Sequence, residues 1–364
     1  MSVTRDISNT TTIPDSNDID EAWLTAALRS VGFDVIVAHF SQTPVGNGQV
    51  GDTFRYTIGY EGQANGAPSS IIGKHHSANA DSRAIARQLG LYRNEFMFYR
   101  DLASKTDAAM ARPYFVVNDE DERFALLLED LAPAAPADQL VGITPRQARL
   151  AVIEAAKLHA AHWSSLAKPP GDWLNRRPLA QGVAGPDELV AHWPLFEERY
   201  RDLVAPEHMQ VAEAFVRHAH AWNRPLDLPH SLTHNDFRPD NLMFATSAGG
   251  KPVAIVDWQT LSYHYGILDI AYLLGGSFEG DQRYALEQEL LPEYHEALCS
   301  LGVRDFSLDQ CRHYYRYFTF AGLTVAIIAS VTVKRTERGD RLFANMIARH
   351  CSHILDQDAL QLLD

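Results

Sequence analysis

The sequence predicts an α+β protein in which a small antiparallel lobe precedes a larger, mainly helical lobe. Short segments rich in β-branched and aromatic residues occupy much of residues 33–129, whereas capped helical patterns dominate after residue 144. The chain has 364 residues and 46% hydrophobic content, enough for one large or two packed domains. We expect a flexible tail over residues 1–17, a first lobe over 18–131 and a second lobe over 132–364.

The first lobe is expected to begin with a helix and to continue as a sheet. Asp18 followed three residues later by Glu21 is the pattern of a capping box, and Gly32 is suited to end the helix that it opens. Apolar runs then predict five strands, and an apolar stripe at helical spacing predicts a helix after the third. The strands are placed at residues 33–43, 53–60, 69–74, 114–118 and 124–129, and the helix at residues 80–102.

The second lobe is predicted to be helical apart from one hairpin. Thr144, Pro145 and Gln147 give a capping box with proline at the first helical position, which predicts a helix to about residue 165. Gly249-Gly250 lies between two apolar runs and predicts a hairpin turn joining strands 241–244 and 253–257. Further helical patterns cover residues 186–202, 206–222, 266–274, 281–301, 308–331 and 336–355.

The composition disfavours several classes of partner. The net charge is -14, from 32 Lys and Arg against 46 Asp and Glu, whereas proteins that bind duplexes or membrane surfaces are usually basic. Residues 1–20 lack the apolar core of a signal peptide, and the apolar run 321–333 is too short to span a bilayer. The three cysteines have neither a zinc spacing nor a disulfide framework. We therefore expect a cytoplasmic protein without nucleic-acid or membrane partners.

Three polar residues within residues 231–259 carry the strongest functional signal. Asp236 and Asn241 are five apart in one predicted loop, and Asp257 ends the apolar run VAIVD. The predicted hairpin brings the three side chains to one end. Carboxylate and amide oxygens are the ligands that Mg²⁺ prefers, and phosphoryl transfer needs such ligands together with a carboxylate that takes the acceptor proton. Protein kinases use His-Arg-Asp, four residues, Asn and then Asp-Phe-Gly, and this chain keeps that spacing.

These residues resemble the aminoglycoside phosphotransferase and choline kinase group, the small-molecule branch of the protein-kinase-like fold. The resemblance is carried by LTHNDFRPDNLMF, IVDWQ and GILDIAYLL, and it extends over most of the chain after about residue 40. It implies a bilobal fold, with a nucleotide-binding N-lobe and a C-lobe that holds the catalytic loop and the acceptor site. It also implies that His234 holds the loop by hydrogen bonds and that Asp269 braces it from a buried position. Asn235 departs from the His-Gly-Asp typical of the group, at a position without a chemical role.

The motif predicts a role for each polar residue of the catalytic loop. Asp236 is the candidate catalytic residue that accepts the proton of the acceptor hydroxyl or orients that hydroxyl. Asn241 and Asp257 are the candidate Mg²⁺ ligands. Arg238, two residues after Asp236, is either a charge-neutralising group near the γ-phosphate or a surface arginine.

The first lobe offers candidate nucleotide contacts. Gly46, Gly48 and Gly51 lie between two predicted strands, where backbone N–H groups can cradle phosphate, although a plain hairpin turn is an equal alternative. Lys74 ends the third strand, and Glu95 lies on the apolar side of the following helix, where a carboxylate needs a partner. We expect an ion pair between them that holds the α- and β-phosphates, with a solvated Glu95 as the alternative.

The segment after the fifth strand is predicted to link the two lobes. It reads EDL and continues into an Ala/Pro-rich stretch. The resemblance implies that adenine lies against this hinge and bonds its backbone. Glu129 and Leu131 are the candidate positions for those bonds.

Two pairs of histidines suggest metal binding but lack the supporting pattern. His159 and His162 lie one helical turn apart, without an HExxH motif or an evident third ligand. We expect them to pack inside the helical lobe. His75 and His76 are expected to be exposed loop residues.

The combined prediction is a kinase that uses Mg²⁺ and ATP, or alternatively GTP, to phosphorylate a hydroxyl of a small molecule. The acceptor is expected between the catalytic loop and the C-terminal helices, where acidic residues suit an aminoglycoside and aromatic residues suit a choline-like cation, an apolar alcohol or a phenol. The acidic candidates are Glu279, Asp281, Glu287, Glu289, Glu293 and Glu296, and the aromatic ones are Tyr263, Tyr265, Tyr272, Phe278, Tyr314 and Tyr315.

Two alternatives of other kinds remain open. One is a nucleotide-binding regulatory module without transfer activity, which the complete Asp/Asn/Asp set disfavours. The other is a protein kinase, which is disfavoured because Trp258 and Gln259 replace the Phe and Gly of Asp-Phe-Gly and no Ala-Pro-Glu follows. The sequence does not determine the oligomeric state.

Overall fold

The chain forms two compact units, which are described one at a time. The structure, a computed structural model, describes residues 13–46, 50–119, 123–164, 166, 168–174 and 185–363. Unit 1 comprises Met1–Lys105, Met110–Ala132 and Asp257–Gln259, and unit 2 comprises Thr106–Ala109, Pro133–Val256 and Thr260–Asp364. The three residues that begin at Asp257 therefore belong to a different unit from the rest of the 231–259 motif.

Unit 1 is built on a five-stranded antiparallel sheet in the order β1-β2-β3-β5-β4. Each strand overlaps a predicted one, and β3 is the middle strand, so Lys74 lies near the centre of the sheet. The elements are β1 (Val37–Pro44), β2 (Gly51–Tyr60), β3 (Ser70–His76), β4 (Pro113–Asn118), β5 (Phe124–Glu129), α1 (Glu21–Ser30), α2 (Ala80–Leu89) and α3 (Leu91–Met97).

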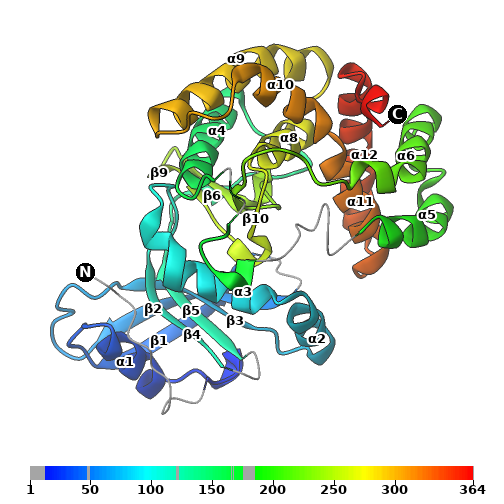
Figure 1. The fold of residues 1–364 in the computed structure, drawn as a ribbon. Coiled ribbons are helices and arrows are strands. Elements are labelled where there is room, and N and C mark those ends of the chain that lie inside the picture. Colours follow the sequence, from blue (N-terminus) through cyan, green and yellow to red (C-terminus); the bar gives the residue numbers. More distant parts are fainter. Residues whose placement is uncertain are drawn as a thin grey trace. The chain divides into compact units, whose positions relative to one another are not determined.

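Helices cover both faces of this sheet, with α1 on one side and α3 on the other (Figure 1). Trp23 of α1 belongs to a buried cluster that includes Ala125 of β5. Tyr92 of α3 stacks on Phe124, with ring centroids 5.1 Å apart. Because successive side chains of a strand point to opposite faces, Phe124 and Ala125 bind the two helices from opposite sides of the sheet.

The single helix expected over residues 80–102 is interrupted. Gly90 adopts a left-handed conformation with φ 60°, which ends α2 and begins α3 in a new direction. A π-helical turn, Phe98–Leu102, completes the segment. The apolar stripe correctly predicted helical structure, but the prediction did not take into account that Gly90 divides the helix.

Two expectations for the N-terminal region were wrong. The N-cap of α1 is Asp20, whose carboxylate accepts the N–H of Trp23 at 2.7 Å, so the predicted capping box at Asp18 does not form. Residues 13–17, assigned to the tail, belong to the fold, since Ile13 is 3% exposed and Ser16 is 2% exposed. The other tail residues, 1–12, lie outside the described ranges.

The expectation that His75 and His76 are exposed loop residues was also wrong, because both end β3 and are buried. His75 Nε2 lies 2.7 Å from the hydroxyl of Tyr56. Burial lowers the pKa of His75 to about 3, so it stays neutral near pH 7. Polar partners inside the sheet thus compensate the burial of residues that the sequence suggested were solvated.

Unit 2 is mainly helical, which confirms the predicted α+β class, and it contains two small antiparallel sheets, β6-β8-β9 and β7-β10. Its strands are β6 (Ala135–Pro136), β7 (Ser231–Thr233), β8 (Leu242–Thr246), β9 (Gly249–Ile255) and β10 (Ser262–His264). Its helices are α4 (Pro145–Ala160), α5 (Pro186–Tyr200), α6 (Pro206–Arg217), α7 (Ala219–Trp222), α8 (Ile267–Ser277), α9 (Gly280–Ser300), α10 (Leu308–Tyr317), α11 (Phe320–Thr332) and α12 (Glu337–Asp356).

The hairpin before Asp257 turns at a different place from the predicted one. Ser247 and Ala248 form the turn between β8 and β9, whereas Gly249 and Gly250 are the first residues of β9. The two glycines have φ values of 112° and 104°. A Cβ at Gly250 would lie 2.8 Å from the backbone nitrogen of Ala134, so glycine is needed for close packing as well as for backbone conformation.

The helix predicted over residues 308–331 is in fact two helices, α10 and α11, separated at Phe318 and Thr319. Among the described residues, Leu308–Thr332 is the one segment long and apolar enough to cross a membrane by length and composition. Of its most apolar window, 67% is buried inside the fold, as is common for core helices of globular proteins. The expectation of a cytoplasmic location stays a prediction.

Candidate active site

The loop between β7 and β8 holds the candidate catalytic carboxylate of unit 2. Asp236 receives three donors: Arg238 Nε lies 2.9 Å from Oδ1, Asn241 Nδ2 lies 2.7 Å from Oδ2, and the Tyr272 hydroxyl makes a long contact of 3.4 Å with Oδ1. The Asp236 side chain is 24% exposed, so solvent still reaches it. The loop therefore presents a positioned proton acceptor.

Asp269 braces this loop from the buried start of α8. Its two carboxylate oxygens accept the backbone N–H groups of His234, at 2.7 Å, and Asn235, at 2.9 Å. His159 Nε2 lies 3.1 Å from the same carboxylate, and its Nδ1 lies 2.7 Å from the hydroxyl of Tyr294. The bracing role implied for Asp269 is confirmed in this geometry, and His159 is a packed, hydrogen-bonded histidine as predicted.

Asn235 shows why this position tolerates few residue types. Its φ is 64°, in the left-handed region that glycine and asparagine enter most readily. Its side-chain Nδ2 donates to the carbonyls of Thr233 and Thr260, and to the hydroxyl of Ser262. The departure from glycine therefore keeps the backbone conformation and adds three hydrogen bonds within unit 2.

His234 and Asn241 connect the loop to the strand that precedes Asp257. His234 Nε2 lies 3.1 Å from the carbonyl of Val256, and the N–H of Val256 donates to the carbonyl of Asn241 at 3.0 Å. This confirms the structural role expected for His234. Both side-chain hydrogen bonds of Asn241 use Nδ2, which donates to the backbone carbonyl and to the carboxylate of Asp236. The amide oxygen is thus the Asn241 atom suited to a hard cation.

Arg238 is part of the loop's charge network and is not an isolated surface arginine. It pairs with Asp236 and, through Nη1, with Asp240. Asp240 in turn accepts the N–H of Gln139 at 3.0 Å. Burial opposes the charge on Arg238, but the two neighbouring carboxylates outweigh that cost and raise its pKa. Asp240 and Tyr272 were not assigned to the site from the sequence, although Tyr272 follows Asp269 at the i, i+3 spacing of one helix face.

In unit 1, Lys74 lies between two carboxylates. Its Nζ is 2.6 Å from Glu95 Oε2 and 3.0 Å from Asp257 Oδ1. The predicted ion pair with Glu95 is therefore present. Burial opposes the charge of Lys74, but Asp257 and Glu95 more than compensate and raise its pKa. Burial raises the pKa of Glu95, and Lys74 offsets part of that rise.

Asp257 and the two residues after it are anchored within unit 1. Asp257 has a φ of 68°, and Trp258 stacks on Phe98 with ring centroids 3.9 Å apart. The Gln259 carbonyl accepts a hydrogen bond from Asn94 at 3.0 Å. The Asp257 side chain remains 39% exposed. Its surroundings therefore hold the backbone rigidly while leaving carboxylate surface for a cation.

The three candidate glycines differ in what the structure says of them. Gly48 lies outside the described residues. Gly46 has a φ of 74°, which favours glycine. A Cβ on Gly51 would lie 3.0 Å from the carbonyl oxygen of His75, tighter than ordinary packing allows. Gly46 and Gly51 are thus explained by backbone requirements, and their contact with phosphate stays a prediction.

The predicted hinge lies at the end of β5. The N–H of Glu129 donates to the carbonyl of Arg112 at 2.8 Å, so this donor is already used. Asp130, between the two candidates, accepts hydrogen bonds from Arg55 at 2.7 Å and from Ser70 at 2.5 Å. These bonds fix the backbone around Leu131, whereas adenine binding here remains a prediction.

Most of the acidic side chains assigned to an acceptor pocket are engaged by cations of unit 2 itself. Arg149 pairs with Glu289 at 2.9 Å and with Glu293 at 2.8 Å. Arg349 pairs with Glu279 at 3.2 Å. Glu287 is 1% exposed, and its pKa is lowered by a histidine, a tyrosine and an arginine that together outweigh burial. Four of the six acidic candidates therefore already have partners within unit 2, and the nature of the acceptor pocket stays a prediction.

A cavity of about 860 Å³ lies elsewhere in unit 2, at the connection between α9 and α10. It is open and mainly apolar, and Glu296 is its one member of the acidic set. None of the residues of the catalytic loop lines it. This cavity therefore does not coincide with the candidate catalytic loop around Asp236.

Comparison with known proteins places this chain in a family. A family model described as the phosphotransferase enzyme family matches residues 82–307. This is more than half of the chain, and the chain belongs to this family of phosphotransferases. No curated protein sequence is significantly similar to it.

Solved structures support the same fold. A Ralstonia eutropha protein provisionally named as an aminoglycoside phosphotransferase is 16% identical, with a TM-score of 0.54 over 94% of this chain and 97% of that one. A microcompartment-associated aminopropanol kinase is 15% identical, with a TM-score of 0.55 over 93% and 99%. The Plasmodium vivax ethanolamine kinase is 9% identical, with a TM-score of 0.52 over 86% and 81%. At these identities the likeness establishes the fold.

Proposed function

We propose that the protein transfers the γ-phosphate of ATP to a hydroxyl group of a small molecule. The observation that carries the proposal is the loop of unit 2, in which Asp236 is held by Arg238 and Asn241 on a backbone braced by Asp269. This geometry suits a proton acceptor, and the family supplies the reaction class.

In this reaction the acceptor oxygen forms a bond to the γ-phosphorus while the bond from that phosphorus to the β-bridging oxygen breaks. The acceptor proton passes to Asp236. Arg238 neutralises charge that develops on the transferred group, as preorganised cations do in low-dielectric sites. Asn241 and Asp257 provide hard oxygen ligands that would hold Mg²⁺, which neutralises charge on the nucleotide phosphates.

The proposed nucleotide contacts belong to unit 1. Lys74, oriented by Glu95, binds the α- and β-phosphates, and backbone N–H groups near Gly46 and Gly51 contact phosphate oxygens. Adenine lies against the segment that contains Leu131. We name ATP as the phosphate donor because of the resemblance to kinases. A comparison of ADP release from Mg·ATP with GDP release from Mg·GTP tests this choice.

For the acceptor, the charges within unit 2 favour a molecule with few positive groups. Arg149 and Arg349 pair with three of the six candidate carboxylates, and Glu287 is buried with its own partners. Residues 175–184, outside the described ranges, contain no Asp or Glu in the sequence. The structurally similar aminopropanol and ethanolamine kinases are named for amino alcohols, which instead favours a cationic acceptor.

The deciding experiment measures ADP or GDP release by the purified protein with Mg·ATP or Mg·GTP. The panel pairs neutral acceptors (sugars, aliphatic alcohols, phenols and macrolides) with cationic ones (amino alcohols and aminoglycosides). We expect release above background with a neutral acceptor. Release confined to cationic acceptors would overturn the acceptor assignment while keeping the kinase.

Two other outcomes contradict the proposal more deeply. Nucleotide affinity without release on the whole panel would favour a regulatory nucleotide-binding module. Phosphate incorporation into proteins, with no small acceptor labelled, would favour a protein kinase. A radiolabelled γ-phosphate assay on protein and small-molecule fractions separates these results.

A further inference from the structure

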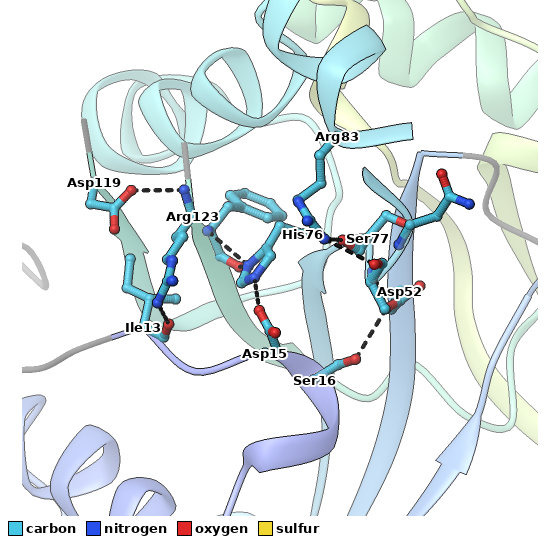
Figure 2. A network of polar contacts seen from close by, with 12 residues as sticks. Ile13, Asp15, Ser16, Asp52, His76, Ser77, Arg83, Asp119 and Arg123 are labelled. Atoms are coloured by element: carbon cyan, nitrogen blue, oxygen red, sulfur yellow. Dashed lines mark hydrogen bonds and ion pairs between the residues drawn. The ribbon is translucent and has the colours of Figure 1, made fainter. Parts of the chain in front are cut away.

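A short N-terminal segment, residues 13–18, is joined by hydrogen bonds to the sheet of unit 1 and its connections. Figure 2 shows Ile13, Asp15 and Ser16 of this segment in a polar network. Its other members include Asp52 of β2, His76 at the end of β3, and Arg123 just before β5. Ile13 is 3% exposed, and its carbonyl accepts a hydrogen bond from Arg123 Nη1 at 3.3 Å. The segment lies outside residues 82–307, which the family model matches. The family match therefore gives no information on this segment, and its role has to be argued from its own contacts.

His76 ties the segment to the middle of the sheet. Its Nε2 lies 2.7 Å from Asp15 Oδ1 (Figure 2), and its Nδ1 lies 3.2 Å from both the N–H and the carbonyl of Phe124. A neutral ring protonated on Nε2 accepts the Phe124 N–H and donates to Asp15, whereas a charged ring donates to the Phe124 carbonyl and to Asp15. Both protonation states keep Asp15 bound.

Ser16 contacts the start of β2. This is the end of the segment that contains Gly46, Gly48 and Gly51, called here the Gly-rich segment. Its hydroxyl donates to Asp52 Oδ2 at 3.0 Å, and the N–H of Ala78 donates to the same oxygen at 3.0 Å. Asp52 directly follows Gly51, which pairs with His76 across β2 and β3. The two anchoring residues of the segment, Asp15 and Ser16, thus bind neighbouring positions of the same strand pair.

The end of the Gly-rich segment, residues 50–52, is held from a second side as well. The Tyr92 hydroxyl of α3 donates to the carbonyl of Val50 and accepts the N–H of Ser77 at 3.0 Å. Arg83 donates to the Ser77 carbonyl at 2.7 Å and to the Ala78 carbonyl at 2.9 Å. Residues 50–52 are therefore fixed between the N-terminal segment and the connection from β3 to α2. On the side of the N-terminal segment, this contact is the hydrogen bond from the Ser16 hydroxyl to Asp52.

We propose that residues 13–18 form a positioning element for nucleotide binding, which acts by holding Asp52 and, through it, residues 50–52. The inference rests on the proposed function, in which N–H groups of this region contact phosphate. Donors that are already oriented lose less conformational freedom when the nucleotide binds. Loss of the Ser16 hydroxyl therefore weakens nucleotide affinity although Ser16 touches no nucleotide.

The test compares Mg·ADP affinity by isothermal titration calorimetry in the full-length protein and in Ser16→Ala. We expect the variant to bind three- to ten-fold more weakly, about the value of one hydrogen bond. Ser30→Ala is the matched control, because that hydroxyl donates to the Ala27 carbonyl at the end of α1 and contacts no residue of 50–52. It is expected to bind as wild type does. Equal affinity in Ser16→Ala and wild type would overturn the positioning role.

A double-mutant cycle with Asp52→Ala tests the route of the effect. If Ser16 acts through Asp52, removal of its hydroxyl has no further effect in the Asp52→Ala background. An equal loss in both backgrounds would overturn the role assigned to Asp52. If wild type itself binds no Mg·ADP or Mg·GDP, the proposed function fails, and the positioning role fails with it.

Hydrogen exchange gives a measurement that requires no nucleotide. The amides of residues 51–54 are expected to exchange faster in Ser16→Ala than in wild type, while those of β4 stay unchanged. Unchanged exchange at residues 51–54 would contradict the proposal even if affinity fell for another reason. This measurement also remains interpretable if Asp52→Ala fails to fold.

Discussion

The two units hold their charged site residues in different ways. In unit 2, Asp236 and Asp269 each accept hydrogen bonds from several groups, most of which are neutral. In unit 1, the single cation Lys74 contacts two carboxylates, Glu95 and Asp257. The loop of unit 2 is thus organised mainly by hydrogen bonds, whereas the cluster of unit 1 keeps an excess of negative charge that a further cation would balance. Substitutions should therefore affect geometry in unit 2 and electrostatics in unit 1.

The largest effect is expected for Asp236→Asn, which tests the chemical role of the unit 2 loop. An amide is nearly the same size but cannot take the acceptor proton, so turnover should fall by about 100- to 10,000-fold. Nucleotide affinity, assigned mainly to unit 1, should stay within about three-fold of wild type. Product release and calorimetry on one preparation measure both. Turnover near wild type would remove Asp236 from the mechanism.

The next effect concerns the charge cluster of unit 1. Lys74→Met leaves Glu95, which is 1% exposed, without its cation, and we expect a loss of stability of about 3 kcal/mol or more and loss of nucleotide binding. Lys74→Met with Glu95→Gln removes the stranded charge. The double variant should regain much of the stability, measured by chemical denaturation, but none of the nucleotide affinity. Recovery of affinity would show that Lys74 does not bind the phosphates.

A smaller effect tests the backbone organisation of the unit 2 loop at Asn235. Asn235→Ala loses three side-chain hydrogen bonds and also places a Cβ residue at a φ of 64°. Asn235→Gly loses the same bonds without the backbone strain, so it should be the more stable variant by about 1 kcal/mol. Thermal unfolding of the two variants gives the order. The reverse order would mean that the conformation of this loop is not what selects the residue.

The smallest effect is a pH dependence in unit 1. The hydrogen bond from His76 lowers the pKa of Asp15. A depressed folded-state pKa stabilises the protein above the unfolded value of about 4, and the contribution is lost as pH falls through the folded pKa. Because the Asp15 side chain is 53% exposed, the contribution should not exceed about 1 kcal/mol. The difference in unfolding free energy between wild type and Asp15→Asn should therefore be larger at pH 7 than at pH 3.

The contrast between the units also explains which site residues could be predicted. Asp236 and Asn241 lie in one short loop, and their separation of five residues is a local property that spacing reveals. Lys74 and Glu95 were paired because a carboxylate on an apolar helix face needs a partner. Tyr272 was not assigned to the site, because its hydrogen bond to Asp236 depends on how α8 packs against the loop. Asp240 lies in the loop itself, but its ion pair with Arg238 depends on how the loop folds.

By itself, the sequence determined the α+β class, the strand and helix types, and the catalytic motif, because periodicity, caps and motif spacing are local. The tertiary structure decided features that depend on packing between distant segments. It buried His75 and His76, divided the 80–102 helix at Gly90, and joined residues 13–18 to the sheet. It also engaged most of the acidic acceptor candidates in ion pairs. Burial and pairing depend on neighbours that are remote in the chain, and a pattern of nearby residues does not contain them.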